Sequence, residues 1–168
     1  NNAFGSTASK QPITLSGKVT AIGNYASGLY VSSYGIVTIS GITSTGNTAV
    51  GGYGTYISNM GADTALGVNL NGINAISDNH RDGLFISTKG AIRINGLTAN
   101  GNGIVASAGV GANLSSTVSG GVAFTGVNTF NGNYTAGLAI QTNGAITLST
   151  VTASNTVNGM GLSVDNTA

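Results

Sequence analysis

The residues with acid–base chemistry are few, and most of them lie in one short run. Asp78, His80, Arg81 and Asp82 belong to the segment DNHRD, so a single loop could hold an acid, a base and a cation. Cleavage of a glycosidic bond commonly uses two carboxylates about 5 to 9.5 Å apart. The run at 78–82 is therefore where a polysaccharide lyase or hydrolase would carry its catalytic groups.

The other acids do not complete such a site. The chain has four acidic residues, all of them Asp, and the two outside the run are Asp63 and Asp165. No two of the four occupy equivalent outward positions in adjacent copies of the repeat described below. We expect the 78–82 run to be a solvated turn whose charges pair locally, with no catalytic residue and no cofactor. Catalysis on a polysaccharide stays the less favoured alternative.

Composition excludes several classes of function. The 168 residues carry 5% charged side chains and a net charge of +1, against about 25% charged in an average domain. Such a chain lacks the basic surface that nucleic-acid binding needs. With no Cys and one His it cannot build a Cys/His metal site. No apolar run approaches the roughly 20 residues of a membrane-spanning helix, so we expect no membrane insertion. The abundance of Gly, Asn, Ser, Thr and β-branched residues favours strands and turns.

Three short motifs recur in fixed order and must position any functional side chain. The first recurs every 24–29 residues and reads GLYVSS from Gly28, GTYISN from Gly54, GLFIST from Gly83, GANLSS from Gly111, GLAIQT from Gly137 and GLSVDN from Gly161. The second reads PITLSG, IVTISG, GVNLNG, AIRING, GVAFTG and AITLST. The third follows it as KVTAIGN, ITSTGN, INAISDN, LTANGN, VNTFNGN and VTASNT. Each repeat thus has three extended segments and three turns.

Apolar residues alternate within each motif, which is the pattern of a strand with one buried face. The predicted inward positions of the first motif are Leu29/Val31, Thr55/Ile57, Leu84/Ile86, Ala112/Leu114, Leu138/Ile140 and Leu162/Val164. Those of the second are Ile13/Leu15, Val37/Ile39, Val68/Leu70, Ile92/Ile94, Val122/Phe124 and Ile146/Leu148. Those of the third begin at Val19, Ile42, Ile73, Leu97, Val127 and Val151.

Three short strands per repeat predict an all-β fold, a right-handed parallel β-helix of about six coils. One coil cannot bury its apolar face alone, so stacked coils create the core, and parallel crossovers are overwhelmingly right-handed. We expect a single solenoid domain at 1–168, with an incomplete coil at 1–27, five full coils at 28–160 and the start of another at 161–168. A β-sandwich also has short strands, but it does not usually repeat side chain for side chain at this period.

Polar side chains recur in the turn after the third motif. We expect these residues to stack as a structural ladder between coils, with ligand binding as the alternative; they are Asn24, Asn47, Asp78 and Asn102, with Asn131, Asn133 and Asn155 nearby. Asn113 and Asn133 also begin N-x-[ST] sequons, which allow glycosylation in a host that performs it.

Two kinds of outward row are also predicted. Tyr30, Tyr56 and Phe85 share one outward position in three consecutive coils, where they could stack on one another, contact a partner laterally or bind a glycan. Threonine-rich rows, of the kind that orders ice-like water, are interrupted by other residues; they comprise Thr20, Thr43, Asn74, Thr98, Asn128 and Thr152, and Thr14, Thr38, Asn69, Arg93, Ala123 and Thr147.

The repeat resembles the parallel β-helix (β-solenoid) repeats of large bacterial and archaeal extracellular surface proteins. In those repeats the pattern GLxIxTxGxITLxxVTAxxN recurs, and residues 137–155 read GLAIQTNGAITLSTVTASN. The resemblance covers about residues 12–168. It implies the fold and an extracellular or cell-surface location, but not an activity, because related solenoids serve as adhesins, stalks, filaments and enzymes.

The two ends of the predicted solenoid suggest how it functions. Open strand edges invite pairing with another chain, and GLSVDNTA followed by the N-terminal segment would make one complete coil. We therefore expect a non-catalytic extracellular protein that assembles with itself head to tail into a filament. The expected interface residues are Phe4, Ile13, Leu15, Gly161, Leu162 and Val164. The alternatives are a fragment of a longer solenoid and an adhesive segment that binds a cell-surface or extracellular polysaccharide.

Overall fold

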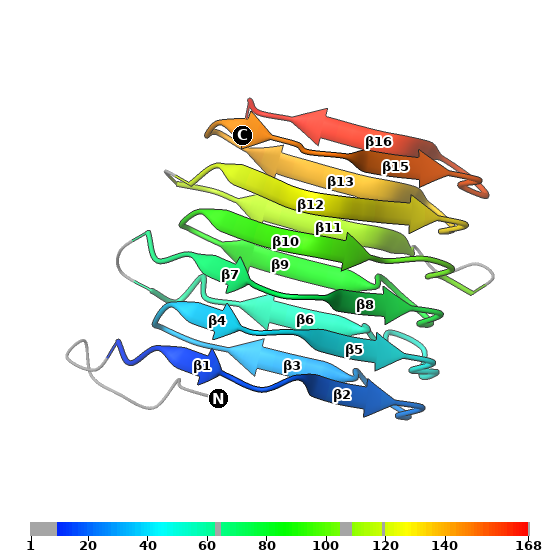
Figure 1. Ribbon diagram of the computed structural model, residues 1–168, viewed down its shortest axis with the longest axis horizontal. Helices are drawn as coiled ribbons and strands as arrows, with labels where there is room; N and C mark the ends of the chain where they lie inside the picture. The colour runs from blue at the N-terminus through cyan, green and yellow to red at the C-terminus, as the bar shows by residue number, and fades with distance from the viewer. Residues whose placement is uncertain (1–9, 63–64, 105–108, 119, 168) are drawn as a thin grey trace.

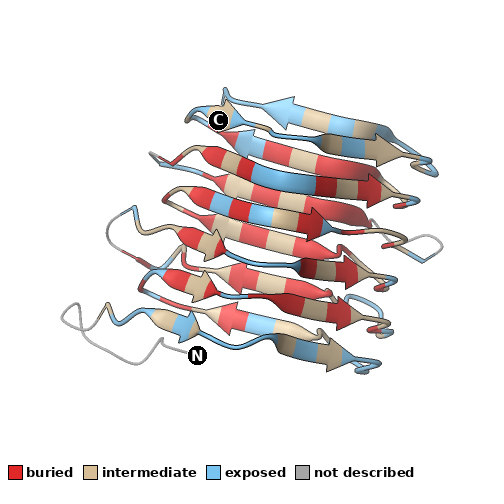
Figure 2. Cartoon of the chain, viewed as in Figure 1, coloured by how far each residue is buried: buried red, intermediate tan, exposed pale blue. Residues whose placement is uncertain are grey.

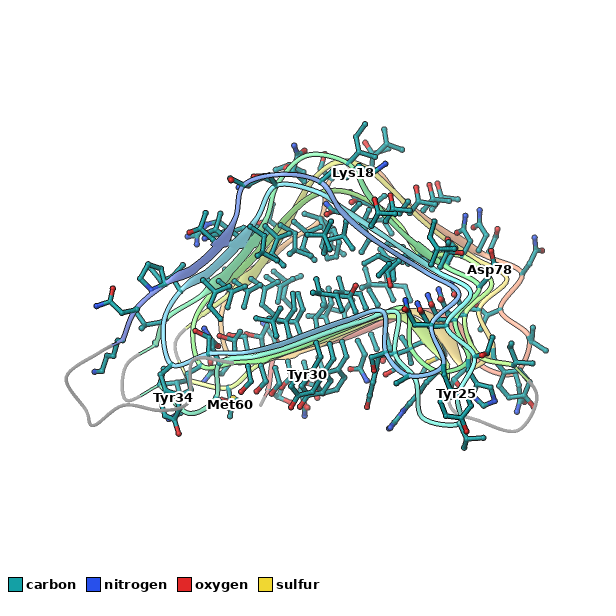
Figure 3. The ribbon with its side chains drawn as sticks, turned by 90° about the horizontal axis from the view of Figure 1, so that it is seen from below. Lys18, Tyr25, Tyr30, Tyr34, Met60 and Asp78 are labelled. Atoms are coloured by element: carbon teal, nitrogen blue, oxygen red, sulfur yellow. The ribbon has the colours of Figure 1, made fainter. Side chains whose placement is uncertain are left out.

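The computed structural model describes residues 10–62, 65–104, 109–118 and 120–167, and within these ranges the chain forms strands and turns without helix. The strands wind into a right-handed parallel β-solenoid of about six turns, which confirms the predicted fold (Figure 1). Figure 1 shows the chain climbing coil by coil from the N-terminus at the bottom to the C-terminus at the top. Seen end-on, the solenoid has a roughly triangular outline (Figure 3).

Each sequence motif forms its own face of this triangle. The first motif forms β3 (Leu29–Ser32), β6 (Thr55–Ser58), β9 (Leu84–Thr88), β11 (Val110–Ser116), β13 (Ala136–Thr142) and β16 (Met160–Asp165). The second forms β1 (Ile13–Leu15), β4 (Val37–Ile39), β7 (Val68–Leu70), the first parts of β10 (Ile92–Thr98) and β12 (Val122–Asn131), and β14 (Ile146–Thr147). The third forms β2 (Val19–Ile22), β5 (Ile42–Thr45), β8 (Asn74–Ser77), the remainders of β10 and β12, and β15 (Val151–Ser154).

The register between coils is the predicted one for the first two motifs. Leu84 of β9 pairs with Thr55 on one side and Ala112 on the other, and Ile92 of β10 pairs with Val68 and Val122. The inward side chains of the inner coils are fully buried and form one continuous core. Figure 2 shows this core as buried bands in the middle coils, whereas the first and last coils are intermediate or exposed. Stacking of like residues on like residues therefore holds the solenoid together.

The third motif departs from the prediction in two coils. Ile73 and Val127, predicted to begin the inward row, are 83% and 67% exposed. Asn74 and Asn128 take the inward positions instead and are buried, and Asn74 pairs with Ile42 of the preceding coil. The predicted register of this motif was therefore wrong by one residue in these two coils. A shift of one residue moves each side chain to the opposite face of a strand, so the predicted inward residues face solvent.

An additional residue at the corner between the second and third motifs causes this shift. The corner glycines Gly72 and Gly126 have φ values of 68° and 69°, which glycine adopts readily. The buried amides then hydrogen-bond the neighbouring corner. Asn74 Nδ2 donates to Gly96 O at 3.1 Å, and Asn128 Nδ2 donates to Ser149 O at 2.9 Å. These bonds offset part of the cost of burying the two amides, although Asn74 Oδ1 is buried without a hydrogen-bond partner.

The corrected register also changes the outward threonine row. Asn74 and Asn128 do not belong to it, and their places are taken by Ala75 and Thr129. The row on the third face therefore consists of Thr20, Thr43, Ala75, Thr98, Thr129 and Thr152. It is more regular than the sequence predicted, with alanine as its one interruption. Threonine is common in strands because its side chain fits a pleated, half-buried surface. We therefore assign no function to this row.

Candidate functional site

The predicted aromatic row is a stacked ladder on the outer face of the first-motif sheet. The rings of Tyr30 and Tyr56 lie 4.9 Å apart with an interplanar angle of 2°, and those of Tyr56 and Phe85 lie 5.0 Å apart at 6°. This spacing follows from the strands, which are about 4.8 Å apart in a sheet. Tyr30 is 64% exposed and points away from the core (Figure 3). The stacking that the sequence analysis offered as one of three alternatives is thus present.

Two residues outside the predicted row, Tyr53 and Arg81, extend this ladder. Tyr53, in the turn before β6, packs its ring 5.3 Å from Tyr56 and 5.4 Å from Phe85, at angles of 61° and 55°. The guanidinium of Arg81 lies over the Tyr53 ring, 4.6 Å from its centroid, in a cation–π contact. Burial raises the pKa of the Tyr53 hydroxyl, and the charge of Arg81 partly opposes this rise. A tyrosine in the turn before an aromatic strand position is the sequence signal for such a contact.

The stacking decides what the ladder can bind. Tyr56 has an aromatic ring on each face, so its own faces are not available to a sugar. A pyranose stacks on a ring face, whereas a row of ring edges and hydroxyls is suited to lateral contact with another surface. At Tyr56, therefore, the geometry favours self-stacking and lateral contact over glycan binding.

The residues of the 78–82 run separate into different environments. Asp78 is exposed, with φ 55°, and Asp82 is buried. Asp82 Oδ1 accepts a hydrogen bond from the Val110 backbone N–H at 3.0 Å, and Asp82 Oδ2 accepts one from Asn113 Nδ2 at 3.4 Å. The Asp82 carboxylate thus ties β11 to the preceding coil. Among the described residues no cluster of three or more His, Cys, Asp or Glu could hold a metal ion.

Replacing Asp82 with asparagine should remove one source of pH dependence from the stability of the chain. Burial is the main cause that raises the pKa of Asp82, and its hydrogen bonds from Val110 and Asn113 oppose it. The folded chain therefore binds this proton more tightly than the unfolded chain. Asp82 then lowers stability as pH rises from about 4, the ordinary Asp value, through its higher folded pKa. Asparagine keeps an oxygen that can accept the Val110 N–H.

The check is urea unfolding of both proteins from about pH 3 to pH 8. The stability of the wild type minus that of Asp82→Asn should fall over this interval. Because all other titrating groups are shared, a difference that rises with pH would contradict a raised pKa at Asp82.

The polar turn after the third motif contains a ladder of five asparagines, Asn24, Asn47, Asn79, Asn102 and Asn133. Each amide nitrogen donates to the Oδ1 of the next member, at 2.9, 2.7, 2.9 and 3.0 Å in order. The Oδ1 of each member after Asn24 also accepts the backbone N–H of the preceding member, at 3.0–3.2 Å. The last four members are fully buried. Every buried amide therefore has partners, and the asparagine ladder fastens one coil to the next.

The predicted ladder was wrong at Asp78. Of the three asparagines that were predicted only to lie near the ladder, Asn133 is a member. Asp78 lies outside it, and its neighbour Asn79 is the member. Asn133 belongs to the ladder, whereas Asn131 accepts the backbone N–H of Ser154 on the outer side at 3.1 Å. Asn155 is exposed, with φ 53°. In each turn, the register decides which of two nearby polar residues faces inward. Composition alone does not reveal this choice.

The recurrent glycine of the first motif is explained by this ladder. A methyl group on Gly83 would lie 2.6 Å from Asn102 Nδ2 and 2.7 Å from the Gly111 carbonyl oxygen. A methyl group on Gly28 or Gly111 would likewise lie 2.7 or 2.6 Å from a ladder amide. The glycine row Gly28, Gly54, Gly83 and Gly111 thus leaves the space that the asparagine ladder fills.

Both sequons lie at partly or fully buried positions. Asn133 is a buried ladder member whose Nδ2 donates to Ala99 O at 2.8 Å, so the folded chain does not present this amide for glycosylation. Asn113 is half-buried beside Asp82.

The predicted assembly residues divide between the two ends of the solenoid. Ile13 and Leu15 are half-buried on β1, and Leu162 and Val164 are exposed on β16 next to the half-buried Gly161. Phe4 lies outside the described residues.

Comparisons with protein-family models, curated proteins and solved structures found no significant match. In the described part of the chain, no helix has the length and apolar character needed to span a membrane.

Proposed function

We propose that this chain is a non-catalytic structural protein of the extracellular space or cell surface that assembles with itself head to tail. One observation carries the proposal. Leu162 and Val164 of β16 are 43% and 46% exposed, whereas Leu138 and Ile140, their partners in the preceding coil, are 0% and 3% exposed. The last described coil therefore presents an apolar inward row that another coil would cover.

The opposite end presents the matching surface. Ile13 and Leu29 at this end are only partly buried, whereas Val37 and Ile39 of the next coil are fully buried. The strands β1, β2 and β3 are edge strands there, and β16 is the edge of the first-motif sheet at the other end. Edge strands offer unpaired N–H and C=O groups to an added strand.

The two end faces contain the same three strand types. In a second copy stacked below the first, β14 would cover β1, β15 would cover β2, and β16 would cover β3, each in parallel. A contact between two different faces generates an open fibre when it stacks the copies along one axis and does not close into a ring. The net charge of +1 and the 5% of charged residues give little repulsion between copies. The extracellular setting rests on the composition and on the resemblance of the repeat.

Replacing Leu162 and Val164 together with lysine should abolish fibres formed by the 168-residue chain. Each fibre joint would then contain two buried, unpaired ammonium groups, which are costly to bury. Negative-stain electron microscopy and sedimentation velocity measure the assembly, and circular dichroism checks the fold. Deletion of residues 162–168 should have the same effect.

The matched control is Ile73→Lys, which places a lysine on a more exposed apolar residue on the side of the solenoid. This variant should assemble as the wild type does. A wild-type chain that stays monomeric at high concentration, or a double-lysine variant that still forms fibres, would overturn the proposal.

A further inference from the structure

The outward row on the second-motif face changes abruptly in size at one point. Arg93 of β10 pairs with Asn69 of β7 on one side and with Ala123 of β12 on the other, and Ala123 pairs with Thr147 of β14. A long side chain thus stands directly beside the shortest one in the row. The surface beside Arg93 is consequently hollow on both sides of this pair.

Two depressions of about 160 and 330 Å³ result, and both are bounded by Arg93 and Ala123. The smaller extends across β12 to Thr147 and Ala145, and the larger extends back across β10 to Asn71 and Asn95. The two depressions adjoin at Arg93 and Ala123, and we call them together the Arg93 trough. Strands of a rigid sheet hold its lining residues at fixed spacing.

The trough is rich in hydrogen-bond donors. Arg93 is exposed and carries five N–H donors, which match a carboxylate or sulfate group in a two-pronged contact. Asn95 Oδ1 accepts from Thr125 Oγ1 at 3.2 Å, so its amide N–H₂ group can serve a ligand. The residues lining both depressions include one cation and no Asp. This lining favours an anion over a neutral or cationic group.

The rest of the lining indicates what carries the anion. Ala91, Ala123 and Ala145 present methyl groups, and Asn71, Thr125 and Thr147 present amide and hydroxyl groups. Sugar rings offer both an apolar C–H face and hydroxyl groups, and a trough crossing several strands suits a chain of them. We propose that the Arg93 trough binds an anionic saccharide chain, with Arg93 holding a carboxylate or sulfate group. This site is independent of the end faces and of the aromatic ladder.

The test is isothermal titration of the full chain with three oligosaccharide probes of similar length. They are an oligogalacturonate, a sulfated dextran and an uncharged dextran, and poly-glutamate serves as an anionic control without sugar rings. The wild type should bind one or both of the charged probes and not the uncharged one, and the tighter of the two identifies the anionic group. Arg93→Ala should weaken this binding roughly tenfold or more, because hydrogen bonds to charged groups are among the stronger ones.

Three further variants separate the effect of shape from that of charge and test the location of the site. Ala123→Leu keeps Arg93 but fills the trough, so it should also weaken binding while leaving the urea midpoint close to that of the wild type. Lys18→Ala removes an exposed cation from the first coil, in the turn between β1 and β2 (Figure 3), and should bind as the wild type does. Tyr30→Ala, in the aromatic ladder, should likewise leave binding unchanged.

Four results would overturn the proposal. These are undiminished binding by Arg93→Ala, equal binding of the uncharged dextran, equally tight binding of poly-glutamate, and no binding of either charged probe. Loss of binding in Tyr30→Ala but not in Arg93→Ala would place a saccharide site on the aromatic ladder instead.

Discussion

Replacing Asn102 with alanine should lower the free energy of unfolding by about 3–5 kcal/mol. Asn102 Oδ1 accepts both the backbone N–H and the side-chain amide of Asn79, at 3.2 and 2.9 Å, and both donors are buried. The variant leaves these donors without that acceptor, and a buried unsatisfied donor costs about 1–3 kcal/mol. It also removes the Asn102 Nδ2 bonds to Asn133 and to Ile76 O. Urea unfolding at neutral pH measures the loss.

The ladder supplies its own matched control. Asn24 is the first member, is exposed, and donates to Asn47 without accepting from another ladder asparagine in the described residues. Asn24→Ala should therefore cost under about 1 kcal/mol, the usual net value of one hydrogen bond near solvent. Equal losses for the two variants would show that the ladder bonds are not what fastens the inner coils.

Replacing Gly83 with alanine should destabilise the chain by about 1–3 kcal/mol or more, the usual cost of overpacking a filled interior. The added methyl group would lie 2.6 Å from Asn102 Nδ2, and the carbonyl oxygen of Gly111 would lie 2.7 Å away on the neighbouring strand. A backbone atom of a paired strand cannot move aside without breaking backbone hydrogen bonds between the strands. Thermal or urea unfolding of the purified variant measures the effect.

Gly17→Ala is the control for this prediction. A methyl group on Gly17 would have no atom within 4 Å, so the change should leave stability unchanged or slightly raise it through the unfolded chain. The double variant Gly83→Ala/Asn102→Ala sharpens the test. Because one clash involves the Asn102 side chain, the two losses should sum to more than the loss of the double variant. Strict additivity would show that the glycine and the asparagine act independently.

Most of the coil architecture could be predicted from apolar alternation. Residues such as Ile57, Leu84 and Ile92 occupy the predicted inward positions, because only the buried face of a strand demands an apolar side chain at every second residue. The prediction failed at Ile73 and Val127, where one additional corner residue moves an asparagine inward. The alternation of apolar residues does not reveal this additional residue. Ile73 and Asn74 could each face the core or solvent, and only the pairing with the neighbouring strand decides between them.

The candidate sites were predictable only in part. The row of Tyr30, Tyr56 and Phe85 follows from the repeat, but the contacts of Tyr53 and Arg81 with it depend on how the turns fold back. The choice of Asn79 over Asp78 depends on which polar residue meets Asn47 and Asn102 of the adjacent coils. The Arg93 trough arises because Ala123, thirty positions later in the sequence, lies beside Arg93.

The amino-acid sequence by itself determined the winding of this chain: its repeat length, its three strand types and most of its inward residues. Repetition and alternation carry that information because each coil has to bury the same face against the next. The tertiary structure alone decided which polar residues face inward, which rings and amides stack, and where the surface is hollow. Those features depend on side chains about one coil apart in sequence, and only the pairing of the strands brings them together.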